Sequence, residues 1–154
     1  MKTKILMVCL GNICRSPLAE GILRSKLDPD NFKVASCGTG NYHVGKAPDS
    51  RSIKVAKANH IDISNQKADQ FKIEYFEIYD MIYTMDEDNY HNVLALASTQ
   101  EDRDKVHSLL DVLADPTLKE VPDPYYGGEQ GFTYVFKIIN QACDMIAEDI
   151  QKPE

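Results

Sequence analysis

The sequence lacks a long apolar segment and a block of basic residues, and each absence excludes a class of function. No stretch approaches the roughly 18–20 apolar residues that a membrane-spanning helix needs, so we expect no membrane partner. The net charge is −7 and lysines and arginines do not cluster, so we expect no nucleic acid partner, because phosphate backbones require clustered basic residues. Any anion must therefore bind at a local site that acts against the overall charge.

Cysteine and histidine are also scarce, and neither has the spacing of a metal site. Four cysteines in 154 residues do not make a disulfide scaffold, and free thiols suit a reducing cytoplasm. The chain opens directly in a predicted strand, so we expect no signal peptide. We expect no metal, because the histidines fall on scattered segments, at His43, His60, His91 and His107. The sequence does not indicate an oligomeric state.

Predicted strands and helices alternate, which is typical of an α/β fold, here a single domain over residues 1–154. Strands are expected over Lys4–Val8, Phe32–Cys37, Tyr79–Met85 and Val106–Leu110. Helices are expected over Pro17–Leu27, 49–60, Asp86–Ala97 and Gly131–Ile150, with loops at 38–48 and 66–77. The alternation predicts a four-stranded parallel sheet between two helical layers. A flavodoxin-like order 2-1-3-4 places the end of the first strand where ligands bind.

Capping residues and apolar spacing support the predicted helices. Ser16 is expected to cap the first helix, with Pro17 at the first helical position, where its missing N–H costs nothing. Asp49 or Ser50 is expected to cap the second helix. The last helix repeats apolar residues at 3.6-residue spacing, which predicts a buried face formed by Phe132, Val135, Phe136, Ile139, Cys143, Ile146 and Ile150.

The clearest functional pattern is C-L-G-N-I-C-R-S at residues 9–16, between the first strand and the first helix. Such a junction directs several backbone N–H groups at one point and attracts anions. A thiol placed there beside Arg15 is expected to ionise easily, which makes the Cys9 thiolate a candidate nucleophile. Gly11 and Asn12 suit a tight turn with positive φ. The Arg15 guanidinium matches two phosphate oxygens, and the Ser16 hydroxyl can donate to the thiolate.

The remaining cysteines have less specific surroundings. Cys14 is either a small apolar residue packed under the loop or a resolving thiol that forms a disulfide with oxidised Cys9, and the two interpretations are compatible. Cys37 lies on a predicted strand and Cys143 on the apolar face of the last helix. Both are expected in the core.

A second loop, V-P-D-P-Y-Y at residues 121–126, supplies a candidate acid. Prolines on both sides of Asp123 stiffen an extended backbone. Thiolate attack on a phosphomonoester requires a proton for the leaving oxygen, so we expect folding to bring Asp123 to Cys9 as a general acid. Aromatic walls would favour an aryl phosphate. The candidates for walls and floor are Tyr42, Tyr125, Tyr126 and Ile13.

Together these segments resemble the low-molecular-weight protein tyrosine phosphatase family over nearly the whole chain. Its two signatures, C-L-G-N-I-C-R-S-P and D-P-Y-Y, occur in the right order and separation. Further similar segments are S-C-G-T at Ser36–Thr39, the stretch from Tyr42 through Gly45 to Arg51, and Met85-Asp86 through Asn89. The resemblance implies hydrolysis of phosphotyrosine in a protein partner, without a metal or an organic cofactor.

The resemblance also implies residue roles. Cys9 forms a phosphocysteine intermediate, while Asp123 protonates the tyrosine oxygen and later deprotonates water. The phosphoryl oxygens are held by Leu10, Gly11, Asn12, Ile13, Cys14, Arg15 and Ser16. The supporting hydrogen-bonding residues are Asn12, Ser16, Ser36, Asp49 and Arg51. In this family the tyrosines at Tyr125 and Tyr126 can themselves be phosphorylated.

The chain departs from the family at one segment. Gln66 and Asp69 stand where members often carry the histidine and arginine of H-x-A-R. We expect the Gln66 amide to replace the histidine in bracing the loop asparagine. Loss of the arginine is expected to alter loop stability or the substrate surface, but not the chemistry.

Three other functions fit the cysteine loop less well. An arsenate-reductase-like redox enzyme of this fold uses further cysteines after the third strand, and none lies between Cys37 and Cys143. A protein-arginine phosphatase carries threonine at the position of Ile13. A non-catalytic phosphate-binding module would be expected to have lost Cys9 or Asp123.

Overall fold

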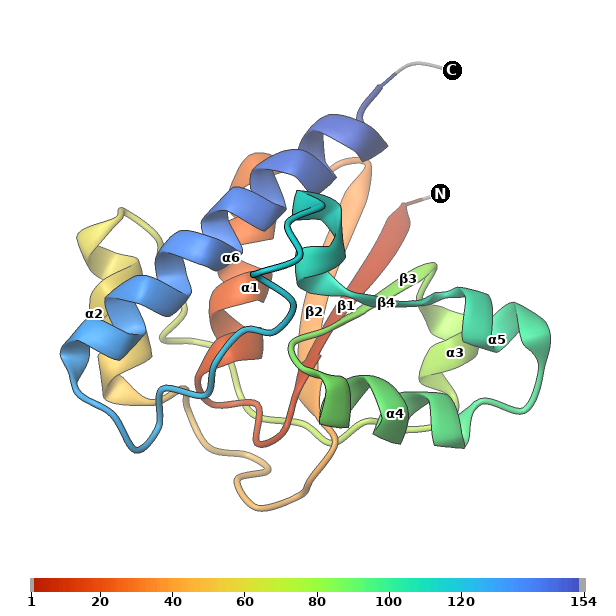
Figure 1. Ribbon diagram of the computed structural model, residues 1–154, viewed down its shortest axis with the longest axis horizontal. Helices are drawn as coiled ribbons and strands as arrows, with labels where there is room; N and C mark the ends of the chain where they lie inside the picture. The colour runs from red at the N-terminus through yellow and green to blue at the C-terminus, as the bar shows by residue number, and fades with distance from the viewer. Residues whose placement is uncertain (1, 153–154) are drawn as a thin grey trace.

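Within residues 2–152, which the computed structural model describes, one parallel sheet has the strand order β2-β1-β3-β4 (Figure 1). The strands are β1 (Thr3–Cys9), β2 (Phe32–Gly38), β3 (Met81–Thr84) and β4 (Val106–Ser108). β1 pairs with both β2 and β3, and β4 extends the sheet beyond β3. This is the predicted flavodoxin-like order, and it leaves β1 at the centre with its carboxyl end at the switch point.

The four expected helices are present, and three short ones add to them. The long helices are α1 (Arg15–Lys26), α2 (Ser50–Ala58), α4 (Glu87–Leu96) and α6 (Glu129–Ile150). The short ones are α3 (Tyr75–Ile78), α5 (Gln100–Asp104) and the 3₁₀ helix η1 (Leu109–Leu113). The prediction missed these because four or five residues are too few to show a helical period.

The sheet is covered on both faces, and the alternation of β1 explains how. Ile5 and Met7 pack with α1 and α6, whereas Leu6 and Val8 pack on the other face with Phe76 of α3. A strand buried on both faces reads as a continuous apolar run, as K-I-L-M-V nearly does. The predicted apolar face of α6 is buried, apart from the partly buried Ile150 at its end.

The start of α1 differs from the prediction. The helix begins at Arg15, and its N-cap, Cys14, makes no side-chain capping bond, so the assignment of Ser16 as cap was wrong. The Ser16 hydroxyl contacts Cys9 and Asn12 instead. Pro17 still lies in the first turn, where an N–H has no intrahelical acceptor. Asp49 caps α2 as predicted and accepts the N–H of Arg51.

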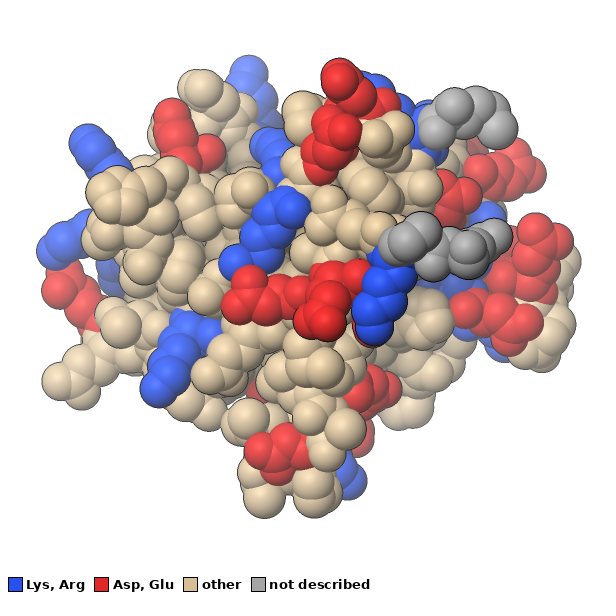
Figure 2. All heavy atoms as spheres, turned by 90° about the horizontal axis from the view of Figure 1, so that it is seen from above, with Lys and Arg blue, Asp and Glu red and all other residues tan. Residues whose placement is uncertain are grey.

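Surface charges are mixed on the side opposite to the loops that follow β1 and β2. Figure 2 shows basic and acidic side chains interspersed there, with acidic ones gathered toward the right-hand end of the view. Among residues 2–152, no helix combines the length and the apolar character needed to span a membrane.

Candidate active site

Three loops that lie far apart in the sequence meet below the carboxyl end of β1, at the lower edge of Figure 1. They are the cysteine loop (residues 9–16), the loop of residues 39–49, and the acid loop (residues 120–128). Together they enclose a pocket of about 400 Å³. Its lining residues are Cys9, Leu10, Gly11, Ile13, Cys14, Arg15, Tyr42, His43, Asp123, Tyr125 and Tyr126. The pocket therefore brings the predicted nucleophile, acid and aromatic walls together.

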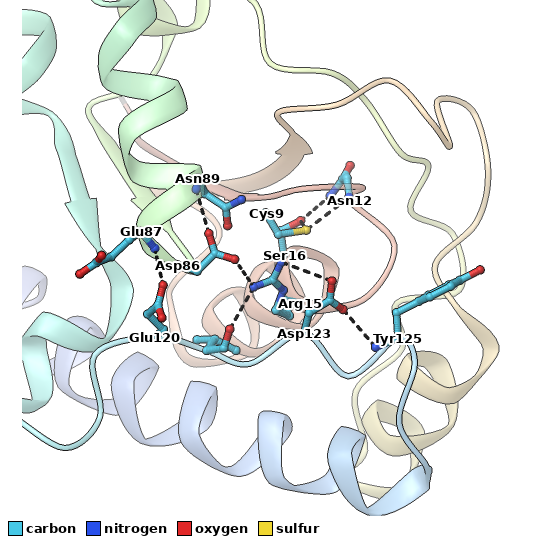
Figure 3. A network of polar contacts seen from close by, with 11 residues as sticks. Cys9, Asn12, Arg15, Ser16, Asp86, Glu87, Asn89, Glu120, Asp123 and Tyr125 are labelled. Atoms are coloured by element: carbon cyan, nitrogen blue, oxygen red, sulfur yellow. Dashed lines mark hydrogen bonds and ion pairs between the residues drawn. The ribbon is translucent and has the colours of Figure 1, made fainter.

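Cys9 ends β1, and its sulfur has two close polar neighbours. The backbone N–H of Asn12 donates to Cys9 Sγ at 3.2 Å, and Ser16 Oγ lies 3.0 Å from the same sulfur (Figure 3). Asn12 has the left-handed backbone conformation, with φ of 58°. The positive φ thus falls on Asn12 and not on Gly11. At Gly11 the missing Cβ matters for space, since it would lie 3.0 Å from the ring of His43.

The Asn12 side chain is the centre of a buried hydrogen-bond network. Its Nδ2 donates to Ser16 Oγ at 2.7 Å and to Ser36 Oγ at 3.0 Å. Its Oδ1 accepts the backbone N–H of Asp69 at 2.9 Å. Ser36 in turn donates to Glu20 at 2.7 Å. Each polar group of the Asn12 amide therefore has a partner, which fixes the turn below Cys9.

Gln66 and Asp69, where the chain departs from the family pattern, differ in their relation to this network. Gln66 Nε2 donates to the carbonyl of Pro17 at 3.1 Å and does not contact Asn12. The expected bracing of the asparagine by the Gln66 amide was therefore wrong. The backbone N–H of Asp69 braces the asparagine instead. Because a backbone group makes this contact, the residue type at position 69 could not predict it.

Arg15 is buried, with a side chain 4% exposed, and lies between two carboxylates (Figure 3). Its Nη1 donates to Asp86 Oδ2 at 2.7 Å and to the Val121 carbonyl at 2.9 Å. Its Nη2 lies 3.8 Å from Asp123 Oδ2. Burial opposes the charge of Arg15, but the neighbouring Cys9 and the bond to Asp86 raise the pKa of the guanidinium above its ordinary value. Arg15 therefore stays charged at the floor of the pocket.

The acid loop is fixed at its start and open at its tip. Val121 is buried and donates its N–H to the Met85 carbonyl at 2.8 Å, while Glu120 accepts the N–H of Glu87 at 2.8 Å. The Asp123 side chain is 44% exposed, and its Oδ1 accepts the N–H of Tyr125 at 3.0 Å. The anchored backbone thus presents a carboxyl group at the pocket that water can reach.

Asp49 and Arg51 link the cysteine loop to the acid loop. The Asp49 N–H donates to the Ile13 carbonyl at 2.7 Å, and the Asp49 carboxylate binds the Arg51 guanidinium. Arg51 then donates to the carbonyls of Tyr125 and Gly127 at 2.9 and 3.0 Å. The support that we expected these side chains to give the cysteine loop goes mainly to the acid loop.

The other three cysteines are poor nucleophiles. Burial, assisted by Asp49, raises the pKa of the Cys14 thiol to about 12. Burial likewise raises the pKa of Cys143 to about 12 and that of Cys37 well above its ordinary value. The Cys9 sulfur, by contrast, accepts a backbone N–H and lies near the Arg15 guanidinium.

Two residues of the site were not assigned a place by the sequence. His43 lies on the pocket wall, with its ring 6.4 Å from that of Tyr125. Its position next to Tyr42 was the available clue. Asp86 caps α4 through the N–H of Asn89 and binds Arg15 with its other oxygen. Within the described residues no group of three or more His, Cys, Asp or Glu is placed to hold a metal ion.

Comparisons with known proteins agree over nearly the whole chain. The sequence model of the family described as "Low molecular weight phosphotyrosine protein phosphatase" matches residues 4–154. The protein of that name from Saccharomyces cerevisiae is 38% identical over 145 residues, which cover 90% of this chain and 89% of the relative. A protein tyrosine phosphatase from Entamoeba histolytica, solved with Hepes in its active site, superposes with a TM-score of 0.92 at 34% identity and covers 97% of both chains. Vibrio vulnificus Wzb in complex with benzylphosphonate has a TM-score of 0.86 at 31% identity, covering 97% of this chain and 99% of that one.

Proposed function

The chain belongs to the low molecular weight phosphotyrosine protein phosphatase family, and we propose that it hydrolyses protein phosphotyrosine through a phosphocysteine intermediate on Cys9. The proposal rests on one juxtaposition above all. Cys9, Arg15 and Asp123 line one pocket, with Asp123 Oδ2 3.8 Å from Arg15 Nη2, although Asp123 lies 114 positions after Cys9 in the sequence. A nucleophile, a fixed cation and an acid are the groups that the reaction requires.

In the first step the Cys9 thiolate attacks the phosphorus of the substrate. An S–P bond forms while the bond from phosphorus to the tyrosine oxygen breaks. The protonated carboxyl of Asp123 donates its proton to that oxygen, so the phenol leaves neutral. Arg15 and the N–H groups of the cysteine loop hold the phosphoryl oxygens, whose charge they stabilise in the transition state.

In the second step water attacks the phosphocysteine. The Asp123 carboxylate takes a proton from the water, the new P–O bond forms, and the S–P bond breaks to release inorganic phosphate and the thiolate. Ser16 Oγ, 3.0 Å from the sulfur, stabilises the departing anion. The enzyme returns to its starting state without a cofactor in the cycle.

The pocket walls favour an aryl phosphate. Tyr42, Tyr125 and Tyr126 border the entrance, and Ile13 supplies an apolar surface beside the cysteine. Rings pack well against such walls in edge-on or offset arrangements. The Wzb neighbour binds benzylphosphonate, a phosphonate on an aromatic ring.

All four cysteines are free thiols, which suits the reducing cytoplasm where we place the protein.

The test measures metal-free turnover of two substrates, p-nitrophenyl phosphate and a phosphotyrosine peptide. Cys9→Ser is expected to abolish turnover of both. Asp123→Ala is expected to reduce kcat/KM, which reports the first step, by about 10²–10⁴-fold for phosphotyrosine, the usual contribution of a positioned general acid. The loss should be smaller for p-nitrophenyl phosphate, because nitrophenolate is a better leaving group and needs the proton less.

Asp104→Ala is the matched control, since it removes an exposed carboxylate on α5, outside the pocket. It is expected to retain full activity. Turnover that survives Cys9→Ser, or an Asp123→Ala loss of kcat/KM that is equal for both substrates, would refute the proposed mechanism.

A further inference from the structure

Tyr75 lies on α3 and packs on the face of the sheet that carries Leu6 and Val8. It is nevertheless linked to the cysteine loop through a single residue, Asp69. Its hydroxyl donates to the Asp69 carboxylate, and the Asp69 backbone N–H donates to Asn12 Oδ1 at 2.9 Å. We propose that Tyr75 and Asp69 are a pair of positioning residues that hold the left-handed Asn12 turn below Cys9. The proposal deepens the proposed function, because it concerns how the nucleophile of that reaction is held.

The Asp69 backbone is fixed from the sheet side. The Gly38 N–H, at the end of β2, donates to the Asp69 carbonyl at 2.8 Å, and the Phe71 N–H donates to the Gly38 carbonyl at 2.7 Å. The Asp69 side chain extends toward α3, where Tyr75 binds it and Lys72 lies 3.9 Å away. The orientation of the Asp69 peptide therefore depends on both its backbone bonds and its carboxylate partner.

Tyr75 is a rigid donor because aromatic rings hold it on two sides. Its ring meets Phe71 edge-on at 5.8 Å and Tyr79 at 5.5 Å. An ordinary tyrosine hydroxyl, with a pKa of about 10, already keeps its proton at neutral pH, and burial and the bond to Asp69 raise the pKa of Tyr75 further. A hydroxyl that donates to a carboxylate makes one of the stronger hydrogen bonds in proteins.

The contacts of Asn12 carry this positioning to the sulfur. With Oδ1 held by Asp69, the Asn12 Nδ2 points at Ser16 and Ser36, and the backbone N–H points at Cys9 Sγ. A left-handed non-glycine residue persists only where its surroundings fix it. Loosening Asp69 would therefore misdirect the Asn12 backbone N–H. That N–H stabilises the thiolate and is one of the amides that bind the phosphoryl group.

The test compares Tyr75→Phe, which removes only the hydroxyl, with Tyr79→Phe. Tyr79 packs against Tyr75, and its hydroxyl makes no hydrogen bond within residues 2–152. Three kinetic quantities are measured together with Tm: kcat for p-nitrophenyl phosphate, protection of Cys9 from iodoacetate by inorganic phosphate, and the rate of alkylation without phosphate at acidic pH, where the thiolate fraction limits the rate. Tyr75→Phe is expected to lower kcat, phosphate affinity and alkylation rate by about 3–10-fold each, the size of one good hydrogen bond. Tyr79→Phe should stay within about twofold of wild type in all three.

Two substitutions at position 69 complete the test. Asp69→Asn keeps an acceptor for the Tyr75 hydroxyl and is expected to retain most activity, whereas Asp69→Ala should reproduce Tyr75→Phe. Equal kinetics for Tyr75→Phe and Tyr79→Phe, with similar losses in Tm, would reduce Tyr75 to a packing residue and overturn the proposal. Alkylation and phosphate protection do not depend on turnover, so they remain informative even if the wild-type protein fails to hydrolyse phosphate esters.

Discussion

The cysteine loop and the acid loop share one pocket, but they are built differently. In the cysteine loop, Cys9, Asn12 and Ser16 are buried and bonded mainly to one another through side chains and amides. In the acid loop, Tyr126 is 94% exposed, and the backbone carbonyls are held by arginines from other segments. The cysteine loop is stabilised largely by bonds among its own residues, to which Ser36 and Asp69 add, whereas the acid loop is held by residues of other segments.

This difference matches what each loop has to do. A phosphoryl group has fixed tetrahedral geometry, so its binding site gains from donors that need no rearrangement during the reaction. In the proposed mechanism Asp123 must reach the leaving oxygen of a variable protein substrate, so the loop that carries Asp123 can remain accessible. Five predictions test the residues around the two loops, and the second asks whether the loops are energetically separate.

The largest effect is expected at the cation that both loops share. Arg15→Lys keeps the charge but removes the planar fork that binds Asp86 and the Val121 carbonyl. We expect kcat/KM to fall about 10²–10³-fold, as when an oxyanion donor is removed. Inhibition by inorganic phosphate should weaken in parallel. A loss below tenfold in steady-state assays would show that charge alone suffices at this position.

Arg51→Ala should separate the loops. It removes two bonds to acid-loop carbonyls, so we expect kcat to fall about 3–10-fold while phosphate inhibition stays unchanged. Lys54→Ala is the control, since Lys54 lies on the same helix in an exposed ion pair with Glu129. If phosphate inhibition weakened together with kcat, the two loops would be coupled through Asp49.

Tyr42→Ala tests the aromatic rim. Loss of one ring contact should raise KM for phosphotyrosine peptides about 2–10-fold with little change in kcat. Tyr134→Ala removes an exposed tyrosine of α6 that does not line the pocket, and it should leave KM unchanged. An effect of Tyr42→Ala on kcat alone would argue against a wall that contacts the substrate ring.

A smaller effect concerns stability and its dependence on pH. Hydrogen bonds from Arg51 hold the pKa of Asp49 below its ordinary value, against the opposing effect of partial burial. Ionised Asp49 therefore stabilises the fold above the ordinary pKa of about 3.9, and this stability is lost as pH falls through the lower folded-state pKa. Asp49→Asn keeps a cap for α2 but lacks the negative charge, and therefore lacks this contribution to stability. Urea unfolding should show the wild-type advantage at pH 7 and its progressive loss as the pH falls below about 3.9, and a constant gap would contradict the assignment.

The smallest effect on turnover is expected from Cys14→Ser, within about twofold, because the buried thiol with a pKa near 12 is not the nucleophile. The same variant distinguishes the two interpretations of Cys14. If Cys14 is a resolving thiol, reductant should restore activity after peroxide in wild type but not in Cys14→Ser. Equal recovery of both proteins would leave Cys14 as a packing residue.

Sequence reasoning predicted the parts of the site that are continuous in the chain. The cysteine loop and the apolar face of α6 follow from local patterns, and the strand order from the topology that alternating strands and helices favour. Asp123 was predicted as the acid because prolines flank it and because attack by Cys9 requires a proton donor. Contacts that only the tertiary structure creates were missed, such as Asp86 on Arg15 and the Asp69 N–H on Asn12. Ser16 was assigned as a cap because capping preferences are local, whereas its hydroxyl is used by Cys9 and Asn12.

The Val121 carbonyl that holds Arg15 lies 106 positions further along the chain, and this distance has a consequence for the protein during its synthesis. The cysteine loop emerges from the ribosome early, before the segment that holds the Arg15 guanidinium has been translated. Nascent chains therefore carry the thiol without the partner that completes its surroundings. Phosphatase activity is therefore expected to begin only once residues 120–128 have emerged and folded against the cysteine loop.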